Sequence, residues 1–140
     1  MKQTLSMFFI VISVFTIAAC QQSASASQDR TAPSIDHIET SAKWLAKSDC
    51  QNTSETVTAE ITDESGLKQV TLWYRVGADQ KYTPVDMSLV NGKYSVTVKA
   101  LDTPGGEYGV WEFYITAEDT IGNKSQSPLD TSVQLLACVG

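Results

Sequence analysis

Apolar side chains recur at every second position along much of this chain, and this alternation constrains the fold more than any other feature. Successive side chains of a β-strand point to opposite faces of a sheet, so a period of two predicts strands with one buried face. The sequence therefore predicts an all-β domain. The clearest runs are Val57, Ala59, Ile61; Val70, Leu72, Tyr74, Val76; Tyr94, Val96, Val98, Ala100; and Trp111, Phe113, Ile115, Ala117.

Turn-forming residues separate these runs. Asn91 and Gly92 between two alternating segments are a strong signal for a tight hairpin, and Pro84 fits an edge strand better than a central one. Residues 41–47 could hold a single helical turn. About seven antiparallel strands with this punctuation predict a β-sandwich. The expected strands cover residues 35–40, 56–62, 70–76, 82–85, 87–89, 94–100, 110–117 and 131–137.

Several short segments combine strand patterns and turn residues in one order. They are residues 63–67 (DESGL), 70–75 (VTLWYR), 91–96 (NGKYSV), 113–119 (FYITAED) and the pair Gly122 and Asn123. Together they resemble the bacterial Ig-like and fibronectin type III-like domains of secreted proteins, over most of residues 34–130. The resemblance implies an Ig-like sandwich and no particular activity.

The chain departs from antibody-type domains, in which a disulfide joins strands B and F over a buried tryptophan on strand C. The segments expected to form strands B and F contain no cysteine, and Trp73 is out of phase with Leu72 and Tyr74. We expect a core of aliphatic and aromatic side chains without that bridge.

The N-terminal segment predicts export and a lipid anchor. Residues 5–19 are apolar and uncharged after Lys2, which suits a secretory signal but is short for a membrane span of about 20 residues. Ile17, Ala18, Ala19 and Cys20 resemble the lipobox of bacterial lipoproteins. This resemblance implies cleavage before Cys20, lipidation of its thiol, and attachment to the cell membrane or outer membrane, facing the periplasm or exterior. The alternative is an ordinary signal peptide followed by a chance cysteine.

The expected organisation is a signal peptide over residues 1–19, the lipidated cysteine and a flexible linker over residues 20–33, and the sandwich over residues 34–140. The linker is rich in Ser, Ala and Gln and has no apolar periodicity. Cys50 and Cys138 remain as a pair in an oxidising compartment, so we expect a disulfide between them. Two free thiols are the alternative.

Charge and motifs exclude several functional classes. Removing residues 1–19 removes one lysine and no acid, which leaves 9 basic and 16 acidic residues. An acidic body argues against nucleic acid as a partner. The sequence contains no nucleophile motif, phosphate-binding loop or clustered metal ligands, and its single histidine, His37, fits an exposed strand position. We expect a protein that is not an enzyme and needs no cofactor.

Acidic turns offer one candidate site for calcium. Asp63 and Glu64 in one turn, and Asp119 and Asn123 in another, should lie at the same end of a sandwich. Asp, Asn and Gly are also the residues that tight turns use, so turn chemistry is the simpler explanation.

The outward faces of two neighbouring strands offer a second candidate site. With the aliphatic residues inward, Trp73 and Arg75 on one strand and Glu112 and Tyr114 on another point outward. Trp, Tyr and Arg are frequent anchors of protein interfaces, so we expect these residues to contact another protein of the cell envelope. The alternatives are a glycan stacked on the aromatic rings, calcium at the acidic turns, or a structural spacer.

Overall fold

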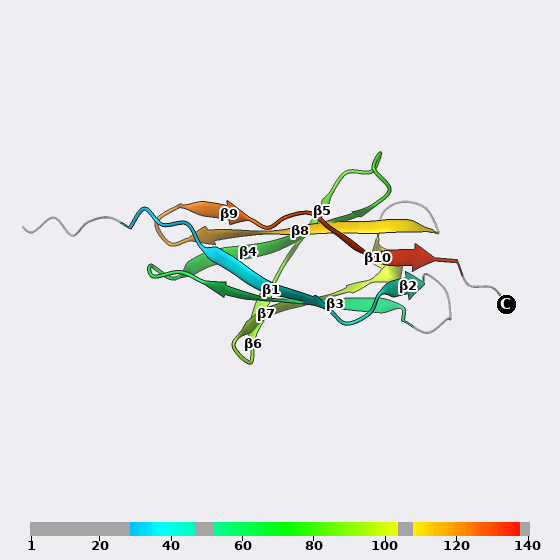
Figure 1. The fold of residues 1–140 in the computed structure, drawn as a ribbon, viewed down its shortest axis with the longest axis horizontal. Coiled ribbons are helices and arrows are strands. Elements are labelled where there is room, and N and C mark those ends of the chain that lie inside the picture. The colour runs from blue at the N-terminus through cyan, green and yellow to red at the C-terminus, as the bar shows by residue number, and fades with distance from the viewer. Residues whose placement is uncertain (1–28, 47–51, 104–107, 138–140) are drawn as a thin grey trace, which may run out of the picture.

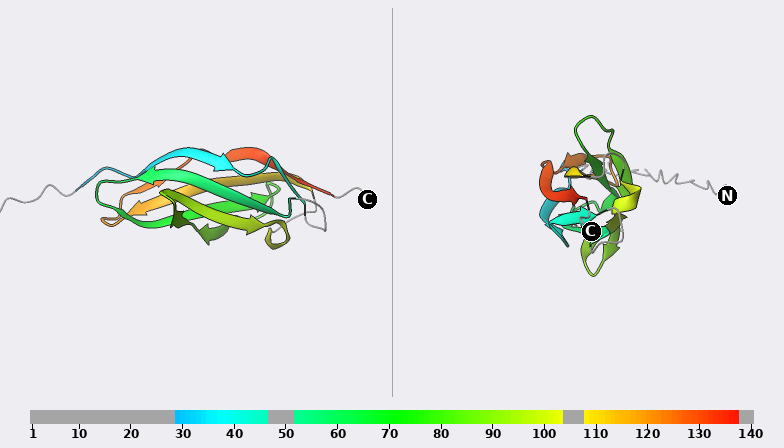
Figure 2. Two further views of the ribbon diagram at one scale, coloured as in Figure 1. Left: turned by 90° about the horizontal axis from the view of Figure 1, so that it is seen from below. Right: turned by 90° about the vertical axis from the view of Figure 1, so that its right-hand side faces the viewer.

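The structure is a computed structural model that describes residues 29–46, 52–103 and 108–137. It is an all-β sandwich, as predicted. Figures 1 and 2 show its two layers, with the described chain entering at one end and leaving at the other. The strands are β1 (Ser34–Thr40), β2 (Trp44–Ala46), β3 (Ser54–Thr62), β4 (Leu67–Val76), β5 (Thr83–Asp86), β6 (Ser88–Val90), β7 (Lys93–Lys99), β8 (Gly109–Asp119), β9 (Lys124–Gln126) and β10 (Asp130–Leu136), with a short 3₁₀ helix η1 (Ala100–Asp102).

The first sheet has the strand order β1-β3-β7-β6, and the second has the order β2-β10-β8-β4-β5. Strand β9 pairs with β8 on the same edge as β10, farther along β8. All pairs are antiparallel except β2 with β10, which is parallel. None of the described segments forms a helix that is long and apolar enough to cross a bilayer.

The helical turn considered for residues 41–47 is wrong for their described part. Residues Trp44–Ala46 form β2 instead, and Leu45 and Ala46 are buried with 0% and 1% exposure. An extended backbone lets this short segment hydrogen-bond to the free edge of β10, which a helical turn cannot do. The chain thereby passes from the first sheet, at β1, to the second.

The core consists of the inward side chains that the alternation predicted. Trp111, Phe113 and Ile115 of β8 are fully buried between the sheets. The ring centroid of Trp111 lies 5.8 Å from that of Tyr74 and 4.9 Å from that of Phe113. Such rings dominate core energetics, and truncating one to alanine typically costs about 3–5 kcal/mol.

The hairpin between β6 and β7 has the conformation that its sequence indicated. Asn91 and Gly92 have φ values of 51° and 84°, the left-handed pair that a tight type I′ turn requires. Pro84 lies on β5, an edge strand as predicted. His37 is exposed on β1, at a bulge where its φ is 46°.

Candidate functional site

Trp73 and Tyr114 form a cross-strand aromatic pair on the outer face of the second sheet. They are register partners on β4 and β8, and their ring planes are 9° apart with centroids separated by 6.2 Å. The indole N–H of Trp73 donates a hydrogen bond of 2.9 Å to Thr116 Oγ1. Both aromatic residues are partly buried. The orientation of the indole is held by this hydrogen bond and by the ring of Tyr114.

Arg75 and Glu112, the other two residues predicted for an interface, bind each other. Arg75 Nη2 lies 2.7 Å from Glu112 Oε2, and the guanidinium also donates to two backbone carbonyls of the β4–β5 loop. Its carbon lies 4.4 Å from the ring centroid of Tyr82, which packs edge-on against Tyr114 with centroids 4.9 Å apart. The hydrogen bond to Glu112 raises the pKa of Arg75. The β4–β5 loop and Tyr82 therefore pack against three of the four predicted residues.

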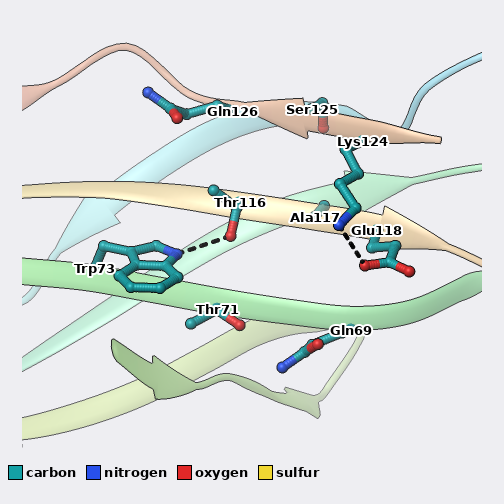
Figure 3. A pocket seen from close by; sticks show the side chains of 9 residues that line it. All are labelled: Gln69, Thr71, Trp73, Thr116, Ala117, Glu118, Lys124, Ser125 and Gln126. Atoms are coloured by element: carbon teal, nitrogen blue, oxygen red, sulfur yellow. Dashed lines mark hydrogen bonds and ion pairs between the residues drawn. The ribbon is translucent and has the colours of Figure 1, made fainter. Parts of the chain in front are cut away.

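A groove of about 460 Å³ runs beside Trp73 on the same face. Strand β4 forms one side, β8 forms the floor, and β9 forms the other side (Figure 3). Indole, amide, hydroxyl and charged groups are combined in its lining. The lining residues are Gln69, Thr71 and Trp73 of β4; Thr116, Ala117 and Glu118 of β8; and Lys124, Ser125 and Gln126 of β9.

The polar side chains of the groove are partly fixed by one another. Glu118 forms ion pairs with Lys68 at 2.6 Å and with Lys124 at 3.1 Å. The hydrogen bonds that these two lysines donate lower the pKa of the Glu118 carboxyl. The hydroxyl of Ser125 is buried and has no hydrogen-bond partner within the described chain. Gln69 Nε2 and Thr71 Oγ1 each donate at 3.1 Å to Asp86 Oδ1 on the neighbouring strand β5.

The sequence predictions missed β9, and therefore one whole side of the groove. A strand of three residues is too short to show a period of two. The signal that was present is the turn formed by Gly122 and Asn123, which reverses the chain after β8 and brings Lys124–Gln126 back alongside it.

The acidic turns meet at the end of the sandwich where the described chain begins. Asp63 and Asp119 approach each other as predicted, but their third neighbour is Asp29, and carboxylate oxygens of these three residues lie within 4.8 Å of one another. Glu64 is exposed and does not belong to this group. Asn123 takes part through its side-chain amide, which donates to Asp119 Oδ2 at 2.6 Å.

Asp119 is fully buried and shapes the turn between β8 and β9. Its Oδ1 accepts hydrogen bonds of 2.6–2.8 Å from the backbone N–H groups of Ile121, Gly122 and Asn123. Burial alone raises the pKa of Asp119, but these bonds and the Asn123 amide outweigh it and hold the pKa below the usual aspartate value. Asp119 is therefore ionised at neutral pH.

Cys20, Cys50 and Cys138 lie outside the described residues, as does the signal segment over residues 1–19. The lipidation of Cys20 and the bridge between Cys50 and Cys138 stay predictions.

No protein-family model matches the chain, and no curated protein matches it either. Among solved structures, the chain is similar to one described as "Crystal structure of Br derivative BhCBM56", which belongs to a carbohydrate-binding module. The TM-score is 0.42 and the identity 17%, with 59% of this chain and 80% of the other covered. A similarity at this level transfers neither a ligand nor an activity.

Proposed function

We propose that the groove of β4, β8 and β9 binds a carbohydrate, and that this protein is a non-catalytic, lipid-anchored binding module outside the cytoplasm. The observation that carries the proposal is the position of the Trp73 indole. It lies in an open outward groove, and the lining of this groove includes side-chain amides and hydroxyls from three strands (Figure 3).

This combination suits a sugar ring, which presents apolar C–H groups on its faces and hydroxyl groups around its edge. An indole offers a large, flat apolar surface. The amides of Gln69 and Gln126, which are both exposed, can donate and accept hydrogen bonds, as sugar hydroxyls require. A volume of about 460 Å³ lies within the usual range for small-molecule sites.

The groove is also organised before any ligand arrives. The indole is fixed by its hydrogen bond to Thr116 and its parallel neighbour Tyr114. The amide of Gln69 is held by Asp86. A ligand that meets side chains already in place loses less conformational entropy on binding.

Binding without hydrolysis fits the acid–base properties of the groove. Glycoside hydrolysis generally uses two carboxyl groups, one of them an acid with a raised pKa. The lining of the groove contains one carboxyl group, that of Glu118, and its two lysine partners lower its pKa instead.

The direct test is a glycan panel applied to the purified full chain, followed by calorimetry with any glycan that binds. We expect Trp73→Ala to weaken binding about five- to thirtyfold, since a buried aromatic contact contributes on the order of 1–2 kcal/mol. Trp44→Ala is the matched control, because Trp44 is also a partly buried strand tryptophan but lies on β2, away from the groove. The proposal fails if no glycan binds, or if both variants bind like the wild type.

A protein partner of the cell envelope is the second candidate for this face. It is favoured by Trp73, Arg75 and Tyr114, residue types that anchor many interfaces, and by the ion pair that holds Arg75 against Glu112. Crosslinking in the native envelope, followed by capture of the tagged chain, tests it. One captured protein that is lost with Trp73→Ala and Tyr114→Ala, but retained with Trp44→Ala, would favour this candidate over a glycan.

A further inference from the structure

Three aspartates from distant parts of the sequence converge at the end of the sandwich where the described chain begins. Asp29 precedes β1, Asp63 lies in the turn between β3 and β4, and Asp119 ends β8. Carboxylate oxygens of the three lie within 4.8 Å of one another. Two oxygens on opposite sides of one calcium ion, each about 2.4 Å from it, would be about 4.8 Å apart, so the spacing suits ligands of a single ion.

Two of the carboxylates have an oxygen with no partner. Asp29 Oδ2 and Asp63 Oδ2 are both buried, and neither has a hydrogen-bond partner in the described chain. The other oxygen of each is used locally: Asp29 Oδ1 accepts from the backbone N–H of Thr31, and Asp63 Oδ1 accepts from Ser65. An ionised oxygen without a partner is costly to bury. These two oxygens are therefore free, among the residues that the structure describes, to bind a positive ligand.

None of the described basic side chains neutralises the three aspartates. In the described part of the chain, no lysine or arginine forms an ion pair with Asp29, Asp63 or Asp119. The nearby lysines Lys68 and Lys124 are both bound to Glu118. Three carboxylates at this separation repel one another unless a cation lies among them.

We propose that Asp29, Asp63 and Asp119 bind a calcium ion. Hard carboxylate oxygens are the ligands that calcium prefers, and its flexible coordination tolerates three carboxylates with the remaining positions taken by carbonyls or water. A hollow of about 340 Å³, open to solvent, borders Asp63. The side-chain amide of Asn123, which donates to Asp29 O at 3.3 Å and to Asp119 Oδ2, holds two of the three ligand segments together.

The ion gives the site a role that the groove does not have. Asp29 belongs to the segment that leads from the expected anchor at Cys20 to the first strand. An ion shared by Asp29 and the two sandwich turns fastens the end of this segment to the domain.

The test is thermal unfolding of the full chain in EDTA, in calcium and in magnesium, at one ionic strength. We expect calcium at about 100 times its Kd to raise the Tm of the wild type by on the order of 10 °C. Magnesium should raise it far less, because it demands regular octahedral geometry and keeps its water. Asp29→Asn and Asp63→Asn should lose most of the calcium shift, while their Tm in EDTA stays at or above that of the wild type, since one repulsive charge is gone.

Asp79→Asn is the matched control, because Asp79 is an exposed acid in the β4–β5 loop, distant in the fold from the three aspartates. It should keep the full calcium shift. The proposal is overturned if the wild type shows no shift in 10 mM calcium, if magnesium acts equally, or if Asp29→Asn and Asp79→Asn respond alike. Glycan binding by the Trp73 groove is measured separately, so either proposal can fail alone.

Discussion

The buried carboxylate of Glu55 accepts a hydrogen bond of 2.8 Å from the hydroxyl of Ser41, at the point where the chain leaves the first sheet for the second. Both oxygens of Glu55 also accept from the backbone N–H of Ala42, at 3.1 and 3.2 Å. In turn, Ser41 Oγ accepts from the N–H of Thr56. Glu55 thus provides hydrogen-bond acceptors for the Ser41 hydroxyl and the Ala42 backbone N–H, where the chain crosses between the sheets.

We expect Glu55→Ala to destabilise the protein by about 1–3 kcal/mol, because it leaves the Ser41 hydroxyl and the partly buried backbone N–H of Ala42 without their acceptor. Glu60→Ala is the control on the same strand: Glu60 is an outward residue whose ion pair with Lys93 contributes at most about 1 kcal/mol. Urea unfolding of both variants measures the difference. Equal losses in the free energy of unfolding would mean that the hydrogen bonds of Glu55 contribute no more to stability than the surface ion pair of Glu60.

The lowered pKa values of Glu118 and Asp119 predict how stability depends on acid. A carboxyl whose pKa is lower in the folded state stabilises the fold above its unfolded pKa of about 4, and this contribution is lost as the pH falls through the folded value. In EDTA, the Tm should therefore be nearly constant from pH 7 to 5 and should fall below about pH 4. Asp119→Asn should be less stable at pH 7 but less sensitive to acid; an unchanged acid dependence in this variant would contradict the assignment.

The expected lipid anchor can be tested by intact mass. We expect the mature wild-type chain to begin at Cys20 and to carry the added mass of a diacylglyceryl group. Cys20→Ser removes the only thiol at the expected cleavage site and should carry no lipid, while Cys50→Ser should be lipidated like the wild type. Lipid on the Cys20→Ser variant, or its absence from the wild type, would rule out this anchor.

The expected bridge between Cys50 and Cys138 can be tested by thiol titration. Ala46 and Leu136, the last residues of β2 and β10 and the strand residues that precede the two cysteines, are register partners. We expect no free thiol at these positions in the non-reduced protein, and a loss of about 4 kcal/mol on reduction by the chain-entropy model. The double variant Cys50→Ala, Cys138→Ala should be insensitive to reductant. Two free thiols in the native protein would exclude the bridge.

The period of two was sufficient to place most strands and the inward or outward direction of Trp73, Tyr114 and the core residues, because it reports directly which side chains share a sheet face. The period of two also places Glu55 on the buried face of its strand, because Glu55 has the same phase as Val57 and Ala59. A charged residue in the buried phase indicates a specific polar partner.

Asp29 and Tyr82 could not be assigned to their clusters from the sequence. Asp29 lies in a segment without periodicity, and its contact with Asn123 joins residues 94 positions apart. Tyr82 takes its place over Tyr114 because of the path of the β4–β5 loop, and local sequence carries little information about such a path. Contacts of this kind arise from the assembled fold.

The parallel pairing of β2 with β10 determines how the domain responds to mechanical load. The described chain enters and leaves at opposite ends of the sandwich (Figure 1). Strand β2 lies early in the sequence and β10 is the last described strand. A pull between those ends drives the two strands past each other along their length. The pairs Gln134–Trp44, Leu135–Leu45 and Leu136–Ala46 are then loaded in shear and must yield together, whereas strands pulled apart from one end would separate pair by pair.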